Sequence, residues 1–125
     1  MIVYVCNDLI FSSRIRALAE DLGIEAESAL DIESLRALLP ETDGQAQDDA
    51  MTGAVVDLDL GQTALQVVAA IKSHDPTIPV VAFGPHVQPD LLAAARAQGA
   101  DAVMPRSRFS QDMAGVLRRL GNKAE

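Results

Sequence analysis

The chain has 125 residues, of which 49% are hydrophobic and 22% are charged, and this apolar content allows one domain of ordinary size to bury its own core. The formal net charge of -8 argues against nucleic acid as a direct partner, because an acidic surface repels phosphate backbones. A single cysteine excludes an internal disulfide, and no apolar run approaches the roughly 18 residues of a membrane span. We expect a soluble cytoplasmic protein with one domain over residues 1–121 and a tail at residues 122–125.

The amino-terminal segment predicts a strand followed by a helix. Residues 2–6 are a short apolar run rich in β-branched side chains, and apolar residues then recur every three or four positions over residues 11–22. Asn7 or Asp8 can cap this helix by accepting from its free amides, and Gly23 stands where a left-handed residue ends a helix.

The next segment repeats this alternation. Residues 24–29 predict a weaker strand, and Asp31 can cap a short helix that Pro40 prevents from continuing. Residues 54–58 predict a third, buried strand, and residues 64–73 a third helix.

The carboxyl-terminal segment contains two more strand–helix units. Residues 78–83 form a continuous apolar run, which is typical of a strand covered on both faces. Pro89 is placed to begin a fourth helix that Gly99 ends. Residues 100–104 predict the fifth strand, and the apolar spacing over residues 113–120 predicts the fifth helix.

Five strand–helix units in strict alternation predict a doubly wound α/β fold, with one five-stranded parallel sheet and helices on both faces. Functional groups in such folds lie in the crevice beyond the carboxyl ends of the strands. The residues to inspect are therefore those directly after each strand. The segment at residues 41–52 is polar and acidic and lacks apolar periodicity, so we expect a poorly ordered loop there.

Several kinds of active site are excluded by the residues after the strands. No glycine-rich phosphate loop follows the first strand, which argues against the common nucleotide-binding motifs. No cysteine and histidine spacing suits a metal, and no glycine elbow surrounds a serine nucleophile. Cys6 at the end of a buried strand is interpreted as a small core residue, with a redox sensor as the alternative. A hydrolase is therefore not expected.

What remains is Asp57, at the end of the third strand in the sequence VVDLDL. Here the chain resembles the receiver domains of two-component response regulators, the CheY-like family, over essentially residues 1–121. Further matching segments are IPVV at residues 78–81 and GAD at residues 99–101. The resemblance implies a flavodoxin-like fold in which the aspartate at the position of Asp57 accepts a phosphoryl group.

The metal-binding residues of that family are altered here. Its acidic pair after the first strand falls on Cys6 and Asn7, and Asp8 lies one place beyond. A hard divalent ion prefers several oxygen ligands, so we expect weak magnesium affinity and no metal cofactor. If a metal site exists, Asp8, Asp57 and Asp59 are its candidate ligands, although a helix cap and a loop residue explain Asp8 and Asp59 more simply.

The switch residues of the family are altered as well. Its hydroxyl residue falls on Gly84, its switching aromatic on Val103, and its lysine on Arg106, followed by Ser107 in place of proline. Arginine keeps the positive charge without the shape of lysine. We predict that Arg106 neutralises Asp57 directly through a bidentate grip, with a solvent-facing Arg106 as the alternative.

These departures favour a degenerate, or pseudo-, receiver that stands alone, acts by protein contact and is not switched by conventional phosphorylation. Without the metal site of the family, we expect it not to be an enzyme by itself. The first alternative is an active but atypical receiver phosphorylated on Asp57, for which Mg²⁺ is required. The second is a flavodoxin-like module that binds a small ligand, against which the scarcity of aromatic residues argues.

The expected partner is another signalling protein, such as a histidine kinase or an output protein, or a second copy of the chain. Residues 1–59 hold 13 acidic and 3 basic side chains, whereas residues 60–125 hold 5 acidic and 7 basic ones. We therefore place the partner surface on the fourth helix, fifth strand and fifth helix. Its candidate residues are Arg96, Arg108, Arg118 and Arg119, beside the small residues Ala93, Ala94, Ala95 and Ala97.

Overall fold

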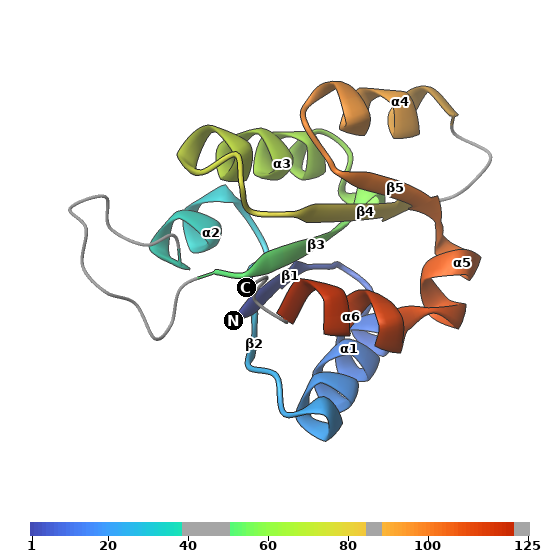
Figure 1. Cartoon of the computed structure of the whole chain (residues 1–125). Helices are drawn as coiled ribbons and strands as arrows, with labels where there is room; N and C mark the ends of the chain where they lie inside the picture. The colour runs from blue at the N-terminus through green and yellow to red at the C-terminus, as the bar shows by residue number, and fades with distance from the viewer. Residues whose placement is uncertain (39–50, 85–88, 122–125) are drawn as a thin grey trace.

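The computed structural model describes residues 1–38, 51–84 and 89–121. Five parallel strands form one sheet in the order β2-β1-β3-β4-β5 (Figure 1). The strands are β1 (Ile2–Val5), β2 (Ala26–Ser28), β3 (Gly53–Asp57), β4 (Val80–Gly84) and β5 (Ala102–Pro105). The doubly wound α/β fold predicted from the alternation is confirmed.

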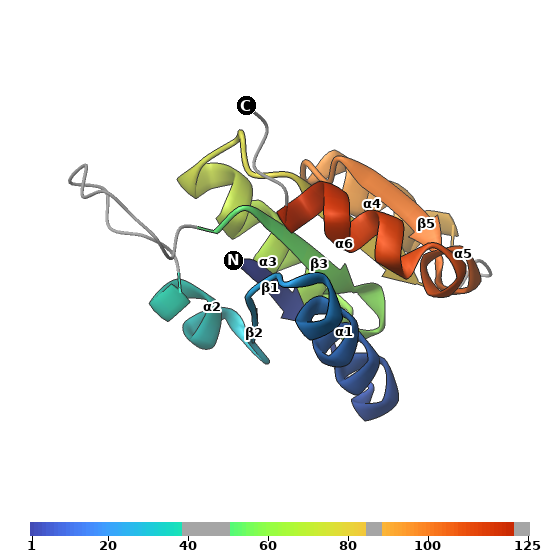
Figure 2. The ribbon, with the colours of Figure 1, turned by 60° about the horizontal axis from the view of Figure 1, so that its bottom comes forward.

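Helices cover both faces of this sheet. They are α1 (Leu9–Leu22), α2 (Ile32–Leu38), the 3-10 turn η1 (Leu58–Leu60), α3 (Gln62–His74), α4 (Pro89–Ala97), α5 (Arg106–Gln111) and α6 (Met113–Gly121). Helices α2, α3 and α4 pack on one face with the core residues Leu35, Val68 and Ala95. Helices α1, α5 and α6 pack on the other, together on the near side in Figure 2.

The predicted helix caps are confirmed. The carboxylate of Asp8 accepts from the amides of Ile10 (2.8 Å) and Phe11 (3.3 Å) at the start of α1. Gly23 ends α1 at φ 73°, in the left-handed region that glycine adopts without strain. Asp31 accepts from the amide of Ser34 at 2.8 Å and caps α2. The cap on α1 also fixes Asp8 just beyond the carboxyl end of β1.

Two elements depart from the sequence prediction. Arg106 begins a short helix, α5, that the sequence did not predict, and Asp59 lies in the turn η1, where a loop was expected. Phe109 is the one fully buried residue of α5, so the segment shows no apolar periodicity that predicts a helix. The turn η1 is too short to leave a sequence pattern.

The third strand begins one residue earlier than predicted, at Gly53. A Cβ atom at this position would lie 2.7 Å from Cβ of Leu120, so glycine allows α6 to pack directly on β3. Met51, just before the strand, is buried, and the amide of Thr52 donates to the carbonyl of Met1 at 2.7 Å.

The structure does not test the predictions for the acidic loop and the carboxyl-terminal tail. Residues 41–50 of the acidic segment and the tail at residues 122–125 lie outside the described residues, so those expectations stay predictions. No helix in the described ranges is both long and apolar enough to cross a membrane.

Candidate functional site

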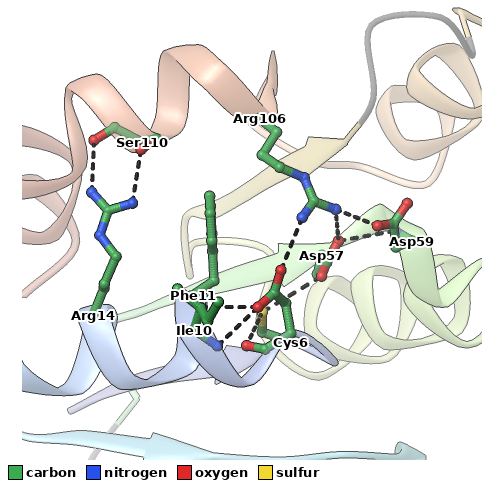
Figure 3. A network of polar contacts seen from close by, with 9 residues as sticks. Cys6, Ile10, Phe11, Arg14, Asp57, Asp59, Arg106 and Ser110 are labelled. Carbon is green, nitrogen blue, oxygen red and sulfur yellow. Dashed lines mark hydrogen bonds and ion pairs between the residues drawn. The ribbon is translucent and has the colours of Figure 1, made fainter.

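The carboxyl ends of β1, β3 and β4 and the start of α5 bring the candidate site residues together (Figure 3). Asp57 is the last residue of β3 and pairs in register with Phe83 of β4. Cys6 follows β1, and Arg106 follows β5 as the first residue of α5. The topology of a parallel sheet thus collects at one edge residues that are about 50 positions apart in the sequence.

Asp57 is the one charged residue that is buried within the described part of the chain. Its side chain is 1% exposed. Oδ1 accepts the backbone amide of Asp59 at 3.0 Å, and Oδ2 accepts the thiol of Cys6 at 3.5 Å. Among the described residues no buried side-chain nitrogen or oxygen lacks a hydrogen-bond partner. Both carboxylate oxygens are therefore committed to donors from the protein itself.

Arg106 contacts Asp57 in a different geometry from the one predicted. Its Nη2 lies 3.6 Å from Oδ1 of Asp57 and also pairs with Asp59, while Nη1 lies 3.3 Å from Oδ2 of Asp8. The expected bidentate grip on Asp57 is therefore wrong, because the guanidinium is shared among three carboxylates. Asp8 caps α1, Asp57 ends β3 and Asp59 lies in η1. Each of these carboxylates contacts one terminal nitrogen of Arg106, and none contacts both.

The three carboxylates do not form a metal site as they are arranged. No group of three or more histidine, cysteine, aspartate or glutamate residues in the described ranges is placed to hold a metal ion. Arg106 lies against Asp8, Asp57 and Asp59. A metal cation bound by these carboxylates would lie next to the positive charge of Arg106, which is unfavourable. The thiol of Cys6 also contacts Asp57, and a thiol is a poor partner for a hard cation. The residues therefore do not fit magnesium in this arrangement.

Cys6 is a buried thiol held in its neutral form. Burial raises the pKa of the Cys6 thiol, a backbone hydrogen bond with Asp8 opposes this, and the charge of Asp57 raises the pKa further. A neutral thiol donates to Asp57, whereas a thiolate would face a carboxylate across 3.5 Å. This environment is the opposite of the electropositive, exposed setting of reactive cysteines.

We predict that Cys6 makes stability fall in alkaline solution. The pKa of the Cys6 thiol is raised in the folded state. The contribution of this thiol to the free energy of unfolding is therefore complete below its ordinary pKa of 9.0 and is lost as the pH rises through the folded pKa. The check is the free energy of unfolding, measured on both sides of pH 9.0 for the wild type and for Cys6→Ala. The wild type should show the steeper decline; equal slopes would contradict the prediction.

Gly84 and Val103, at which the resemblance implies switch residues, lie on β4 and β5. A Cβ atom on Gly84 would lie 2.9 Å from Cβ of Leu58, whose side chain is fully buried. Val103 is partly buried on β5, and its carbonyl accepts from Arg96 at 3.4 Å. Leu58 thus fills the space that a larger residue at position 84 would need.

Phe11 contacts the site, although it was not among the predicted site residues. The guanidinium carbon of Arg106 lies 5.3 Å from the ring centre of Phe11 and 5.9 Å from that of Phe83. Phe83 in turn stacks on Phe109 at 4.5 Å. The helical spacing assigned Phe11 to the core face of α1, but its position three residues after the cap, facing the crevice, was the available signal.

The predicted partner surface is mixed in its exposure. Its four arginines, Arg96, Arg108, Arg118 and Arg119, are exposed. Ala95, however, is fully buried in the core, so the expectation that it offers close approach to a partner is wrong. A second exposed region was not predicted: Leu9 and Ile10 on the first turn of α1 are 82% and 72% exposed.

Comparison with known proteins places the fold. No protein-family model matches the chain, and no curated protein sequence matches it. Among solved structures, the receiver domain of NtrX from Brucella abortus is 21% identical, with a TM-score of 0.76 over 99% of this chain and 100% of that one. The chain spans 27% of the longer NtrX structure from the same bacterium.

Two further structures agree with this result. A response regulator receiver protein from Pseudoalteromonas atlantica is 14% identical, with a TM-score of 0.74 over 100% of both chains. The phosphorylated cyanobacterial phytochrome response regulator RcpA is 21% identical, with a TM-score of 0.68 over 99% of this chain and 96% of that one. The chain therefore has the fold of response regulator receiver domains, and its function has to be argued from the site.

Proposed function

We propose that the chain is a receiver-like signalling module that acts by protein contact and is not switched by conventional phosphorylation of Asp57. The observation that carries this proposal is the position of Arg106, whose guanidinium contacts Asp8, Asp57 and Asp59 at once. In this proposal the chain catalyses no reaction by itself and uses no cofactor.

Phosphoryl transfer to a carboxylate requires an exposed acceptor oxygen, a metal that neutralises charge and donors for the moving oxygens. Here the acceptor side chain is 1% exposed, and both of its oxygens already accept hydrogen bonds. The hydroxyl that would follow the phosphoryl group is replaced by Gly84, packed against Leu58. These features support a module whose surface, and not its crevice, carries the signal.

Treatment with a small-molecule phosphodonor and magnesium tests this proposal directly. The intact protein is expected to keep its mass, whereas a conventional receiver treated in parallel should gain one phosphoryl group. Asp57→Asn serves as the matched variant, because it removes the acceptor with little change in shape. A phosphoryl adduct on the wild type that is absent from Asp57→Asn would overturn the proposal.

One observation favours the alternative of an active but atypical receiver. Asp8, Asp57 and Asp59 all reach the same guanidinium, so the three carboxylates lie near one another. If Arg106 moved away, they would offer a divalent cation its preferred oxygen ligands. Under this alternative the phosphodonor experiment gives an adduct that requires magnesium.

For its partner we propose a signalling protein or a second copy of the chain, docking on α4, β5 and α6. The exposed Arg118 and Arg119 lie in the last turn of α6, and only Arg119 has an ion pair among the described residues, with Asp112 at 3.7 Å. An exposed pair of this kind contributes little to stability, so both charges are available to a partner.

Charge reversal tests this surface. The variant Arg118→Glu/Arg119→Glu should weaken the complex at least about tenfold, because like charges replace complementary ones across the interface. Arg36→Glu, an exposed arginine on α2, is the matched control and should leave binding intact. The measurements are recovery of partners from the native host and self-association by sedimentation. Unchanged association of the folded α6 variant would exclude this face.

A further inference from the structure

The seam between α1 and α5 is lined by aromatic rings and two arginines. Phe11 on α1 stacks on Phe83 of β4, with ring centres 5.5 Å apart. Arg106 and Arg14 place their guanidinium carbons 5.3 Å and 5.5 Å from the centre of the Phe11 ring. In Figure 3, Phe11 stands between these two arginines.

Arg14 also joins the two helices. Its Nη1 donates to the hydroxyl of Ser110 at 2.9 Å, and its Nη2 donates to the Ser110 carbonyl at 3.4 Å. Ser110 belongs to α5, the helix whose first residue is Arg106. The contact between Arg14 and Ser110 therefore fixes the helix from which Arg106 extends.

We propose that Phe11 is a positioning residue for Arg106, and that the contact between Arg14 and Ser110 holds α5 in the place this requires. The proposal rests on the proposed role of Arg106 in closing the carboxylate crevice. The ring supplies a face on which the planar guanidinium lies, while the carboxylates bind its nitrogens.

The need for such a ring follows from the geometry of Arg106. Its side chain is 29% exposed and has many rotamers, several of which lead into solvent. Its carboxylate partners Asp8 and Asp59 are themselves 35% and 48% exposed, so water competes for the same donors. Contact with Phe11 and Phe83 limits the guanidinium to the orientation that reaches the buried Asp57.

The test is the order of the Arg106 side chain, measured by nuclear magnetic resonance as the exchange of its Nε proton with water. Phe11→Leu should speed this exchange about tenfold, since an aromatic face for the guanidinium is lost. Phe11→Tyr keeps the ring and should restore slow exchange. Leu22→Ala removes an apolar side chain of the same cluster at the other end of α1, away from Arg106, so exchange should stay slow.

Unchanged exchange in a folded Phe11→Leu variant would overturn the proposal. If that variant does not fold, Arg14→Met decides the question, because it removes both hydrogen bonds to Ser110. Faster exchange of Arg106 supports the proposal, and unchanged exchange overturns it. Phosphorylation of the wild type would overturn the proposed function without bearing on this result, because exchange reports the order of Arg106 and not the chemistry of Asp57.

Discussion

Replacing Arg106 by alanine is expected to lower the free energy of unfolding by about 2 to 3 kcal/mol at neutral pH. The substitution leaves the buried charge of Asp57 without a cation, and breaking a buried ion pair from one side costs several kcal/mol. The expected value lies below the roughly 3 to 5 kcal/mol of a fully buried pair because the side chain of Arg106 is 29% exposed, so water replaces part of the interaction.

Urea denaturation of two further variants separates charge from packing. The double variant Arg106→Ala/Asp57→Asn should recover much of the loss, because the uncompensated charge is gone. Arg118→Ala, at an exposed site without an ion pair among the described residues, should change stability by no more than about 0.5 kcal/mol. An Arg106→Ala variant as stable as Arg118→Ala would show that Arg106 is not neutralising a buried group.

Introducing threonine at Gly84, the position of the missing hydroxyl, is expected to cost about 2 kcal/mol of stability. The new Cβ would lie 2.9 Å from Cβ of the fully buried Leu58, and overpacking of a core typically costs about 1 to 3 kcal/mol. The hydroxyl of the receiver family therefore cannot be restored at this position without a change in Leu58.

A double-mutant cycle measures this conflict. Gly84→Thr and Leu58→Ala should each destabilise the chain, and their combination should cost less than the sum, because each relieves the defect of the other. Gly84→Ala separates the effect of the Cβ atom from that of the hydroxyl. Additive losses would indicate that Leu58 does not restrict position 84.

The fold was predictable because the sequence alternates strand and helix patterns with clear stops. Gly23 and Asp31 mark helix ends by local backbone chemistry, which acts within a few residues and is visible in sequence. Helix α5 was not predictable, since its packing rests on Phe109 alone. The start of β3 at Gly53 depends on contact with Leu120, which is 67 positions away.

The candidate site was predictable only in outline. Strand topology placed Asp8, Asp57 and Arg106 at one edge of the sheet, because the ends of parallel strands meet there. How the guanidinium divides among the carboxylates depends on rotamers and on the turn η1, neither of which leaves a pattern in sequence. The contact with Phe11 is also a packing result between elements, so helical spacing alone assigned that residue to the core.

We propose that Arg106 takes the place of a divalent ion beside Asp57. The direct measurement is the amide spectrum of the full chain during titration with magnesium and then beryllofluoride. For the wild type we expect no shifts around Asp57 at millimolar concentrations, and for Arg106→Ala we expect measurable magnesium affinity. Saturable magnesium binding by the wild type, followed by beryllofluoride-dependent shifts that reach Val103, would contradict it.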